Sequence, residues 1–357
     1  MASMNNESTP VIRKETKNRI SVDYEGKLTF KDRMKQKLKA SNTWITAGVN
    51  TVRFILMLGV SFVILYPFFA RIANSFMSHS DVLDATVSLV PKNPTLEIYK
   101  AIIVENNYFD AFFNTLLLSL MCAVIQMMVS CLVGYGLAKF KFKGNAVVMI
   151  SVIITMAIPH IALQRSLQKH FELFDIGKVI SWDYPGIIEL ITGDSIGLVN
   201  TFWPMFILSI GGLAFKNGLY IYLMRQFFKG VPDELEESAY VDGSGVYRTF
   251  FQIILPLAVP MMITIFLFSF SWQWTDEFYH SIFFQADFDG TAVALMPDIL
   301  TKIPSSIRPG AGYGATTLYN NIVKNTGAML IIAPLIVMYL FCQRYLVEGI
   351  ERSGIVG

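Results

Sequence analysis

The sequence predicts an all-α, polytopic membrane protein with six transmembrane helices. Of its 357 residues, 53% are hydrophobic and only 16% are charged, which is too apolar and too charge-poor for a soluble domain of this length. The apolar residues are also gathered into six long windows with almost no ionisable side chains. Because about 20 apolar residues of helix cross the hydrocarbon core of a bilayer, each window is expected to form one span.

The six windows end at ionisable side chains. The first is only marginally long enough for a span, and the third contains a single ionisable group, His160. The windows are Phe54–Ala70, Ala111–Ala138, Gly144–Gln164, Ser195–Phe215, Thr249–Thr275 and Asn325–Gln343. Cys122, Cys131 and Cys342 all lie inside them, so we interpret the cysteines as packing residues rather than as a disulfide framework.

The distribution of Lys and Arg predicts the orientation. Six spans place both termini on one side, and that side carries twenty of the 29 basic residues, including Lys139, Lys141 and Lys143 in one short turn. Since cytoplasmic loops retain basic residues, both termini are expected in the cytoplasm of a bacterial or archaeal plasma membrane. Residues 1–52 form a polar cytoplasmic tail, disordered early and with an interfacial helix near Trp44. We interpret its basic cluster Lys27–Lys39 as a solvated or lipid-headgroup face rather than a nucleic-acid site.

The fourth window is expected to bend. Gly211, Gly212 and Gly218 weaken the helix around Lys216, and charged or irregular positions at membrane depth are tolerated where they face protein or a water-filled cavity. This predicts a helix that lines a pathway. The alternative, that Lys216 snorkels from the end of a shorter helix, stays open.

The segment 231–256, on the side assigned to the cytoplasm, is expected to be a helix-turn-helix. Pro232 and Asp233 start the first helix, whose acidic residues suit its positive N-terminal end. Asp242 and Gly243 end it, because glycine takes a left-handed cap without strain. A second short helix from Ser244 continues into the fifth span at Pro256. Four side chains are expected to be available for contact with a partner: Leu235, Ala239, Tyr240 and Tyr247.

This segment resembles the coupling loop of binding-protein-dependent ABC importer permeases. Glu237-Ser238-Ala239, Gly243 and Ile253-x-Leu255-Pro256 match six of the seven fixed positions of that pattern, with serine at position 238 where the family usually has alanine. Other stretches look like the carbohydrate branch, specifically its maltose-type (MalG-like) second permease. Examples are Asn93-Pro94-Thr95-Leu96, Gly134-Tyr135-Gly136-Leu137-Ala138 and Gln343-Arg344-Tyr345-Leu346-Val347-Glu348-Gly349-Ile350.

The resemblance implies a type I ABC importer (MetI-like) transmembrane domain over residues 53–357. Its partners would be a homologous permease subunit in a heterodimer, two ABC ATPase subunits, an extracytoplasmic solute-binding protein and membrane lipid. The coupling loop 231–256 would dock on the ATPase, which would hold ATP and Mg. The residues assigned to coupling are Glu237, Ser238, Ala239, Asp242, Gly243, Phe250, Leu255 and Pro256. A bulky side chain at position 243 is expected to push the two short helices apart at the docking surface.

A sugar or oligosaccharide is the expected substrate, because aromatic planes with polar neighbours suit its hydroxyls and apolar C–H faces. Five residues are candidates for its pathway: Trp203, Asn217, Trp272, Gln273 and Trp274. The opposing interpretation, that Trp272 and Trp274 belong to a membrane-interface belt, stays open. A non-sugar solute is the alternative within the family.

Two other classes fit the residues less well. A gradient-driven secondary transporter usually places carboxylates or histidines in its spans, and here only His160 and Lys216 are available. An enzyme is not expected: no Gly-x-x-x-x-Gly-Lys-Ser/Thr loop is present to hold ATP. His79, His160, His170 and His280 lack metal-ligand spacing, so we expect neither a metal nor a cofactor in this chain.

Overall fold

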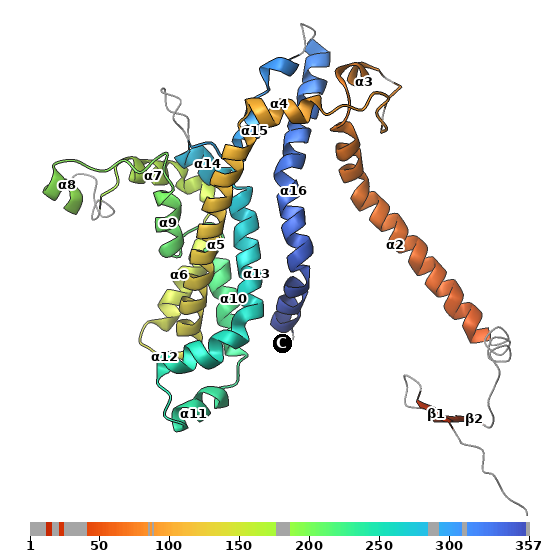
Figure 1. Cartoon of the computed structure of the whole chain (residues 1–357). Helices are drawn as coiled ribbons and strands as arrows, with labels where there is room; N and C mark the ends of the chain where they lie inside the picture. Colours follow the sequence, from red (N-terminus) through yellow and green to blue (C-terminus); the bar gives the residue numbers. More distant parts are fainter. Residues whose placement is uncertain are drawn as a thin grey trace, which may run out of the picture. The chain divides into compact units, whose positions relative to one another are not determined.

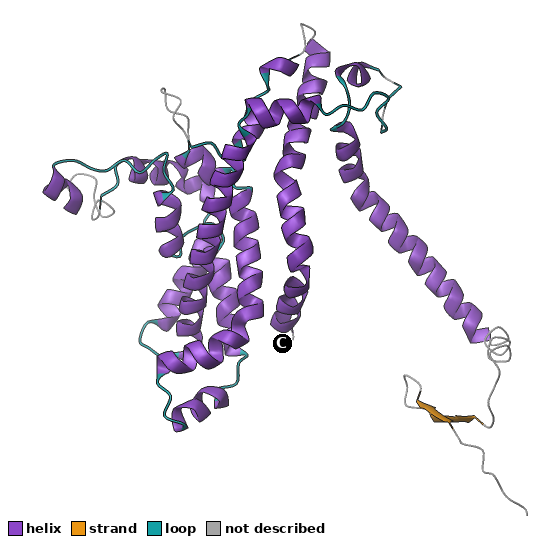
Figure 2. Cartoon of the chain, viewed as in Figure 1, coloured by secondary structure: helices purple, strands orange, loops and turns teal. Residues whose placement is uncertain are grey.

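The structure is a computed structural model that describes residues 12–15, 21–24, 41–84, 86–87, 89–175, 186–284, 293–308 and 313–354 of the 357. The chain divides into two compact units, Met1–Ala70 and Arg71–Gly357, which are described separately. Figures 1 and 2 show that the second unit is built from helices.

The first unit contains a short antiparallel ribbon and most of one long helix. Strands β1 (Ile12–Glu15) and β2 (Ser21–Tyr24) pair in a register that sets Ile12 opposite Tyr24. Helix α2 (Ser41–Asn74) runs without interruption through the expected boundary at residues 52 and 53, so no separate interfacial helix forms near Trp44. The expectation of early disorder falls largely on residues outside the described ranges.

The second unit is organised around helix α5 (Tyr108–Lys139), which packs against α10 (Asn217–Lys229) and α13 (Leu255–Trp274). A buried polar contact ties this centre together. Gln126 on α5 donates to Ser209 Oγ on α9 (Trp203–Ile210) at 3.1 Å and accepts from Ser269 Oγ on α13 at 2.6 Å. Cys122 and Cys131 are fully buried on α5, as expected of packing residues.

The remaining elements are mostly short. Helix α16 (Tyr313–Gly354) is the exception and packs along α13. The others are α3 (His79–Leu83), α4 (Glu97–Glu105), α6 (Asn145–Ala157), α7 (His160–Glu172), α8 (Ile187–Thr192), α11 (Glu234–Val241), α12 (Val246–Thr249), a π-helical turn (Phe250–Ile254), α14 (Phe278–Phe283), α15 (Asp298–Thr301) and a 3-10 turn (Ser305–Ile307).

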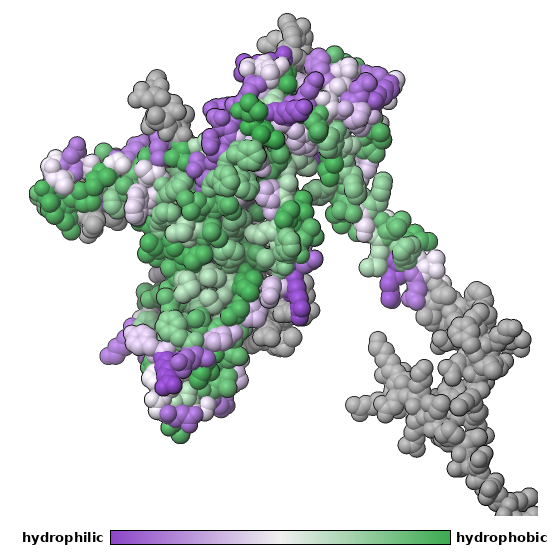
Figure 3. All heavy atoms as spheres, viewed as in Figure 1, coloured by the Kyte–Doolittle hydropathy of each residue, from purple (hydrophilic) through white to green (hydrophobic). Residues whose placement is uncertain are grey.

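The all-helical membrane class is confirmed, but six separate spans are not seen. Within the described residues, four helical stretches are long and apolar enough to cross a bilayer. They are Gly48–Asn74, Tyr108–Lys139, Val246–Trp274 and Thr317–Tyr345. A fifth is reached only if α6 and α7 count as one broken span, because they meet at an angle of 101°. In Figure 3, hydrophobic residues cover the middle of the helical body of the second unit and hydrophilic residues gather toward its ends.

Backbone chemistry explains the two broken windows. Between α6 and α7, Ile158 and Pro159 are extended, because proline disfavours a helical residue before it and has no N–H to donate. Between α9 and α10, Gly212 and Lys216 both have positive φ angles, of 69° and 65°. The expected bend at Lys216 is therefore present, and it is a complete break rather than a kink.

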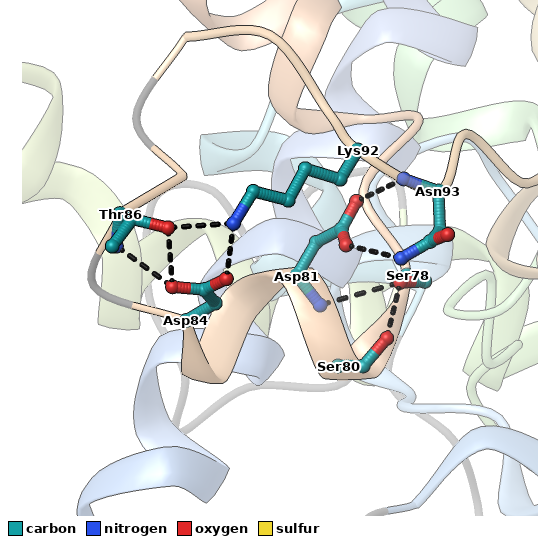
Figure 4. A network of polar contacts seen from close by, with 7 residues as sticks. All are labelled: Ser78, Ser80, Asp81, Asp84, Thr86, Lys92 and Asn93. Atoms are coloured by element: carbon teal, nitrogen blue, oxygen red, sulfur yellow. Dashed lines mark hydrogen bonds and ion pairs between the residues drawn. The ribbon is translucent and has the colours of Figure 1, made fainter.

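At the end of α5 opposite to α11, the segment after α2 is fixed by side-chain hydrogen bonds (Figure 4). Asp81 accepts from the backbone N–H of Asn93 at 2.8 Å and from its side-chain amide at 3.0 Å. Lys92 Nζ bridges Asp84 and Thr86, at 2.6 Å from each. These bonds lower the pKa of both aspartates. They hold the shape of the segment, whose Val82 and Val87 pack against the buried cluster that contains Met77 and Tyr319.

Candidate functional site

The segment 231–256, which the sequence predicts to be a coupling loop, begins with a capped helix, α11. Its first turn carries Glu234, Glu236 and Glu237, which suit the positive end of the helix. At its other end, Gly243 has φ 79° and donates to the Tyr240 carbonyl at 3.0 Å, while the Ser244 N–H reaches the Ala239 carbonyl at 2.9 Å. This pair of bonds is the Schellman motif, which requires a left-handed residue. The predicted glycine cap is confirmed.

The loop then continues directly into the membrane. Residues Val246–Trp274 form one continuous helical stretch, with a π-helical turn at Phe250–Ile254. Pro256 and Pro260 lack the N–H groups that an α-helix would use here, and π turns are frequent at functional sites. The predicted continuation of this segment into the fifth span is therefore confirmed, and α12 and α13 are joined by unbroken helix.

Lys139 at the end of α5 anchors α11, a contact that the sequence analysis missed. Its side chain is only 6% exposed. Its Nζ donates to the Val231 carbonyl at 2.7 Å and to Asp233 at 2.5 Å, and Glu236 lies 3.8 Å away. The ammonium lowers the pKa of Asp233, whereas burial raises the pKa of Glu236 and Lys139 only partly opposes this. The sequence analysis used Lys139 only to predict topology. The acidic residues within 233–237 were the one signal of a basic partner.

Aromatic rings pack beneath the loop and join three helices. Tyr135 of α5 contacts Phe250 of the π turn with ring centroids 4.7 Å apart, and Phe228 of α10 at 5.4 Å. Phe250 is 4% exposed, so it fixes the loop from below and does not offer a surface. Edge-to-face and tilted aromatic pairs of this kind contribute about 1 kcal/mol each beyond the area that they bury.

The exposed side of the loop differs from the expected one at a single position. Ala239 is 4% exposed and packs inward with Glu236, so it is not available for contact with a partner. Glu237, Ser238, Asp242 and Gly243 are exposed, as is Pro256, and Leu255 is half-buried. The large apolar side chains that reach solvent are those of Leu235, Tyr240, Val241, Val246, Tyr247 and Phe251. A Cβ on Gly243 would meet nothing within 4 Å, so alanine fits there without a clash, and the effect of a bulky side chain stays a prediction.

The five pathway candidates do not form one cluster. Trp274 is 1% exposed and donates to the Ile331 carbonyl of α16 at 2.9 Å, which makes it a packing residue. Asn217 is fully buried, and its Oδ1 accepts from Ser130 of α5 at 3.3 Å. Trp203 and Trp272 are exposed, at 59% and 49%. Trp203 is the first residue of α9, whereas Trp272 lies in the last turn of α13. Gln273 is partly buried.

The break before α10 instead gathers a second set of residues around Trp272. Lys216 Nζ lies 4.7 Å from the centre of the Phe215 ring and 5.2 Å from that of Trp272. His160, where α7 begins after the 101° bend, contacts Phe215 with ring centroids 4.6 Å apart. The two helix breaks therefore meet in space, and among the described residues no carboxylate pairs with Lys216. Phe215 was missed, although it adjoins the lysine that the sequence singled out.

No group of three His, Cys, Asp or Glu side chains in the described ranges is placed to hold a metal ion. The arrangement offers two devices: a stiff, anchored helix pair at one end of α5, and a cationic, aromatic break beside α13.

Comparisons with known proteins identify a family and a fold. The family model described as "Binding-protein-dependent transport system inner membrane component" matches residues 126–352. The galactooligosaccharides transport system permease protein GanQ of Bacillus subtilis (strain 168) is 25% identical over 307 residues, which cover 85% of this chain and 94% of that protein. The maltodextrin transport system permease protein MalD of Streptococcus pneumoniae (strain ATCC BAA-255 / R6) is 25% identical over 315 residues, which cover 85% and 95% of the two chains.

A solved structure shares the fold with a TM-score of 0.61 and 21% identity, over 86% of this chain and 98% of that chain. It is the crystal structure of a bacterial ABC transporter involved in the import of the acidic polysaccharide alginate.

Proposed function

Because the chain belongs to the family of binding-protein-dependent transport system inner membrane components, and so is a permease subunit of an ABC importer, we propose that it forms part of the path by which a sugar or oligosaccharide enters the cell. It is a multi-pass membrane protein, and ATP hydrolysis resides in a separate subunit. We place it as the MalG-like second permease, paired with one homologous permease on two ATPase subunits, with both termini in the cytoplasm.

One observation carries the mechanism: α11 is joined to α5 by Lys139, and the helix that follows it enters the membrane without a break. Coupling between distant sites needs a contiguous packed element that can take two positions. In this proposal the exposed side of α11, with Glu237 and Tyr240, lies in a cleft of the ATPase. Closure of that cleft moves α11 together with the N-terminal end of Val246–Trp274 and the end of α5.

The sugar assignment is supported by the relatives, whose names refer to galactooligosaccharides and maltodextrin. Within this chain we retain Trp272 and Gln273 as candidate pathway residues and add Lys216 beside them. Trp203 stays a candidate at the start of α9. Asn217 and Trp274 would act indirectly, by holding the break and α13 in place.

The coupling proposal is tested on the complete importer reconstituted with its binding protein. Glu237→Ala removes an exposed carboxylate and Gly243→Val projects a branched side chain from the docking surface, so each should abolish most substrate-stimulated ATP hydrolysis and uptake. Ser238→Ala is the matched control and should behave as wild type. In the described part of the chain, the Ser238 hydroxyl donates to the Leu235 carbonyl of its own helix. Normal stimulation in both test variants, with normal assembly, would contradict the coupling loop.

The substrate proposal has a separate test. The solute-binding protein that co-purifies with the importer is isolated, and its bound ligand is identified by mass spectrometry. An oligosaccharide or monosaccharide is expected. An amino acid, a peptide or a metal chelate in its place would move the importer to the non-sugar alternative and leave the coupling mechanism untouched.

A further inference from the structure

A cavity of about 550 Å³ lies beside the coupling loop, between the α5–α6 turn and the end of α10. It lies where three helices have an end: α5 at Lys139, α6 at Asn145 and α10 at Lys229. Of these, α5 is long and apolar enough to cross a bilayer by itself. Its charged and aromatic lining is made by Lys141, Lys143, Arg225, Lys229, Phe140 and Phe142.

The turn that forms one wall has a fixed shape. Asn145 donates its side-chain amide to the carbonyls of Leu137 and Phe140, at 3.2 and 3.1 Å. Gly144 has φ 101°, a conformation that a residue with a Cβ rarely adopts. Phe140 is held from the other side by Tyr135, with ring centroids 5.5 Å apart. The lysines of the turn therefore project from a preformed frame.

The charge of this cavity is one-sided. Four basic side chains line it, and the described residues of its lining include no acidic one. Arg225 Nε is buried and has no hydrogen-bond partner in the described part of the chain. An unpartnered buried guanidinium N–H is destabilising, and a bound anion would supply its missing acceptor. Lys139 in the same turn contrasts with this, because its carboxylate partners are already present.

We propose that this cavity binds the headgroup of an anionic phospholipid of the cytoplasmic leaflet, with the phosphate between Arg225 and the turn lysines. Basic pockets between membrane helices at that surface are suited to phosphate headgroups. A lipid fits better than a free phosphate, because the cavity adjoins an apolar face that acyl chains can cover. Val147 and Ile150 of α6 are 67% and 55% exposed, and Phe140 and Phe142 are exposed at the rim.

The site would act on the same machinery from the membrane side. It shares the α5–α6 turn with Lys139, which anchors α11. A bound headgroup would thus brace the turn against which the coupling loop rests. This inference does not depend on which solute the importer carries.

The test is lipid binding to the assembled importer in detergent, followed by native mass spectrometry. Phosphatidylglycerol and phosphatidylcholine with the same acyl chains are titrated in parallel. Each neutralised basic residue should weaken phosphatidylglycerol binding about fivefold, so Lys141→Gln with Lys143→Gln should weaken it about 25-fold. Arg225→Gln, made separately because this side chain is partly buried, should weaken it at least fivefold. Arg248→Gln is the matched control for charge at the same end of α5 but outside the cavity, and it should leave phosphatidylglycerol binding unchanged.

Three outcomes would overturn the proposal: equal binding of the two lipids, an equal loss in Arg248→Gln and in the lysine double variant, or displacement of the lipid by inorganic phosphate at the same concentration. Lys141 and Lys143 are exposed, so we expect the double variant to fold and assemble normally. The same mass spectra show whether the importer is fully assembled.

Discussion

Two lysines near the ends of membrane helices are held in opposite ways. Lys139 ends α5 with a nearly buried side chain that donates to the Val231 carbonyl and to Asp233. Lys216 precedes α10 and lies over the rings of Phe215 and Trp272, with no carboxylate partner among the described residues. An ammonium that is paired inside the protein joins elements firmly, whereas one held by aromatic faces can exchange partners. The first region is suited to transmitting force and the second to meeting a ligand.

The largest effect on stability is expected from Lys139→Met. The substitution leaves the buried Glu236 carboxylate and the Val231 carbonyl without their cation, and breaking such a buried pair costs on the order of 3 kcal/mol. The free energy of unfolding, measured in mixed detergent micelles, checks this. Lys143→Met in the same turn is the control, since Lys143 is exposed, and a loss of similar size there would remove the distinction.

The next largest effects are expected at two glycines that allow close contact between helices, one near Lys139 and one near Lys216. A Cβ on Gly134, near the coupling loop, would lie 2.6 Å from Met224 Cβ, and one on Gly218, next to the break, would lie 2.5 Å from Thr155 Oγ1. We expect Gly134→Ala and Gly218→Ala to destabilise by about 2 kcal/mol each, because overpacking forces helices apart. Gly136→Ala, where a Cβ meets nothing within 4 Å, should be neutral or stabilising. If all three alanine variants changed the free energy of unfolding equally, close helix packing at Gly134 and Gly218 would not explain the effect.

A smaller effect concerns pH and the acids that accompany the two regions. Burial raises the pKa of Asp276, just beyond α13, to about 6, while Lys139 lowers the pKa of Asp233. Between about pH 4 and 6 the folded protein therefore binds a proton at Asp276 that the unfolded chain has released, and this contribution to stability falls as pH rises. The expected loss is on the order of 1.5 kcal/mol, once screening of a partly exposed carboxylate is allowed for.

Asp276→Asn should abolish this loss when unfolding is followed from pH 4 to 7. The contribution of Asp233 has the opposite sign, since it is present above the ordinary pKa of an aspartate and disappears as pH falls through the lowered value. If stability depended on pH in the same way in Asp276→Asn and in the wild type, the assignment to Asp276 would be contradicted.

Gly243→Ala tests the cap of α11 alone. The methyl group meets open space, so only the left-handed backbone is penalised, by about 1 kcal/mol. The measurement is the free energy of unfolding of the full chain, because a peptide spanning 231–256 lacks the contacts that α11 makes with α5. A loss above about 2 kcal/mol would mean that the residue has contacts other than those described here.

The smallest effect on stability is expected from Lys216→Met. A cation–π contact contributes about 0.5–1 kcal/mol, and methionine keeps most of the apolar stem. Uptake kinetics provide the second measurement, and they should change if the break lines the pathway. If Lys216→Met left both the uptake kinetics and the stability unchanged, the alternative that Lys216 is a snorkelling side chain would be favoured.

Much of the local structure was predictable from the residues themselves. Charge-free windows became α5, α13 and α16, because length and hydropathy are properties of a single segment. Gly243 was predicted as a left-handed cap from its type and place, and the chain direction into Pro256 followed from the adjacent span. The fourth window failed as a single helix, since the glycines around Lys216 gave a complete break where a bend was expected.

The membrane class, the long helices and the cap at Gly243 could be predicted from the residues alone. Packing was needed to show that Trp274 and Ala239 face inward, that Lys139 is paired and that His160 contacts Phe215. The difference arises from the solvent. Lipid is as apolar as a protein interior, so helices that are hydrophobic on every face carry no periodic signal to distinguish the packed side from the exposed one. A partner 94 residues away, such as Asp233 for Lys139, is chosen by how the helices pack.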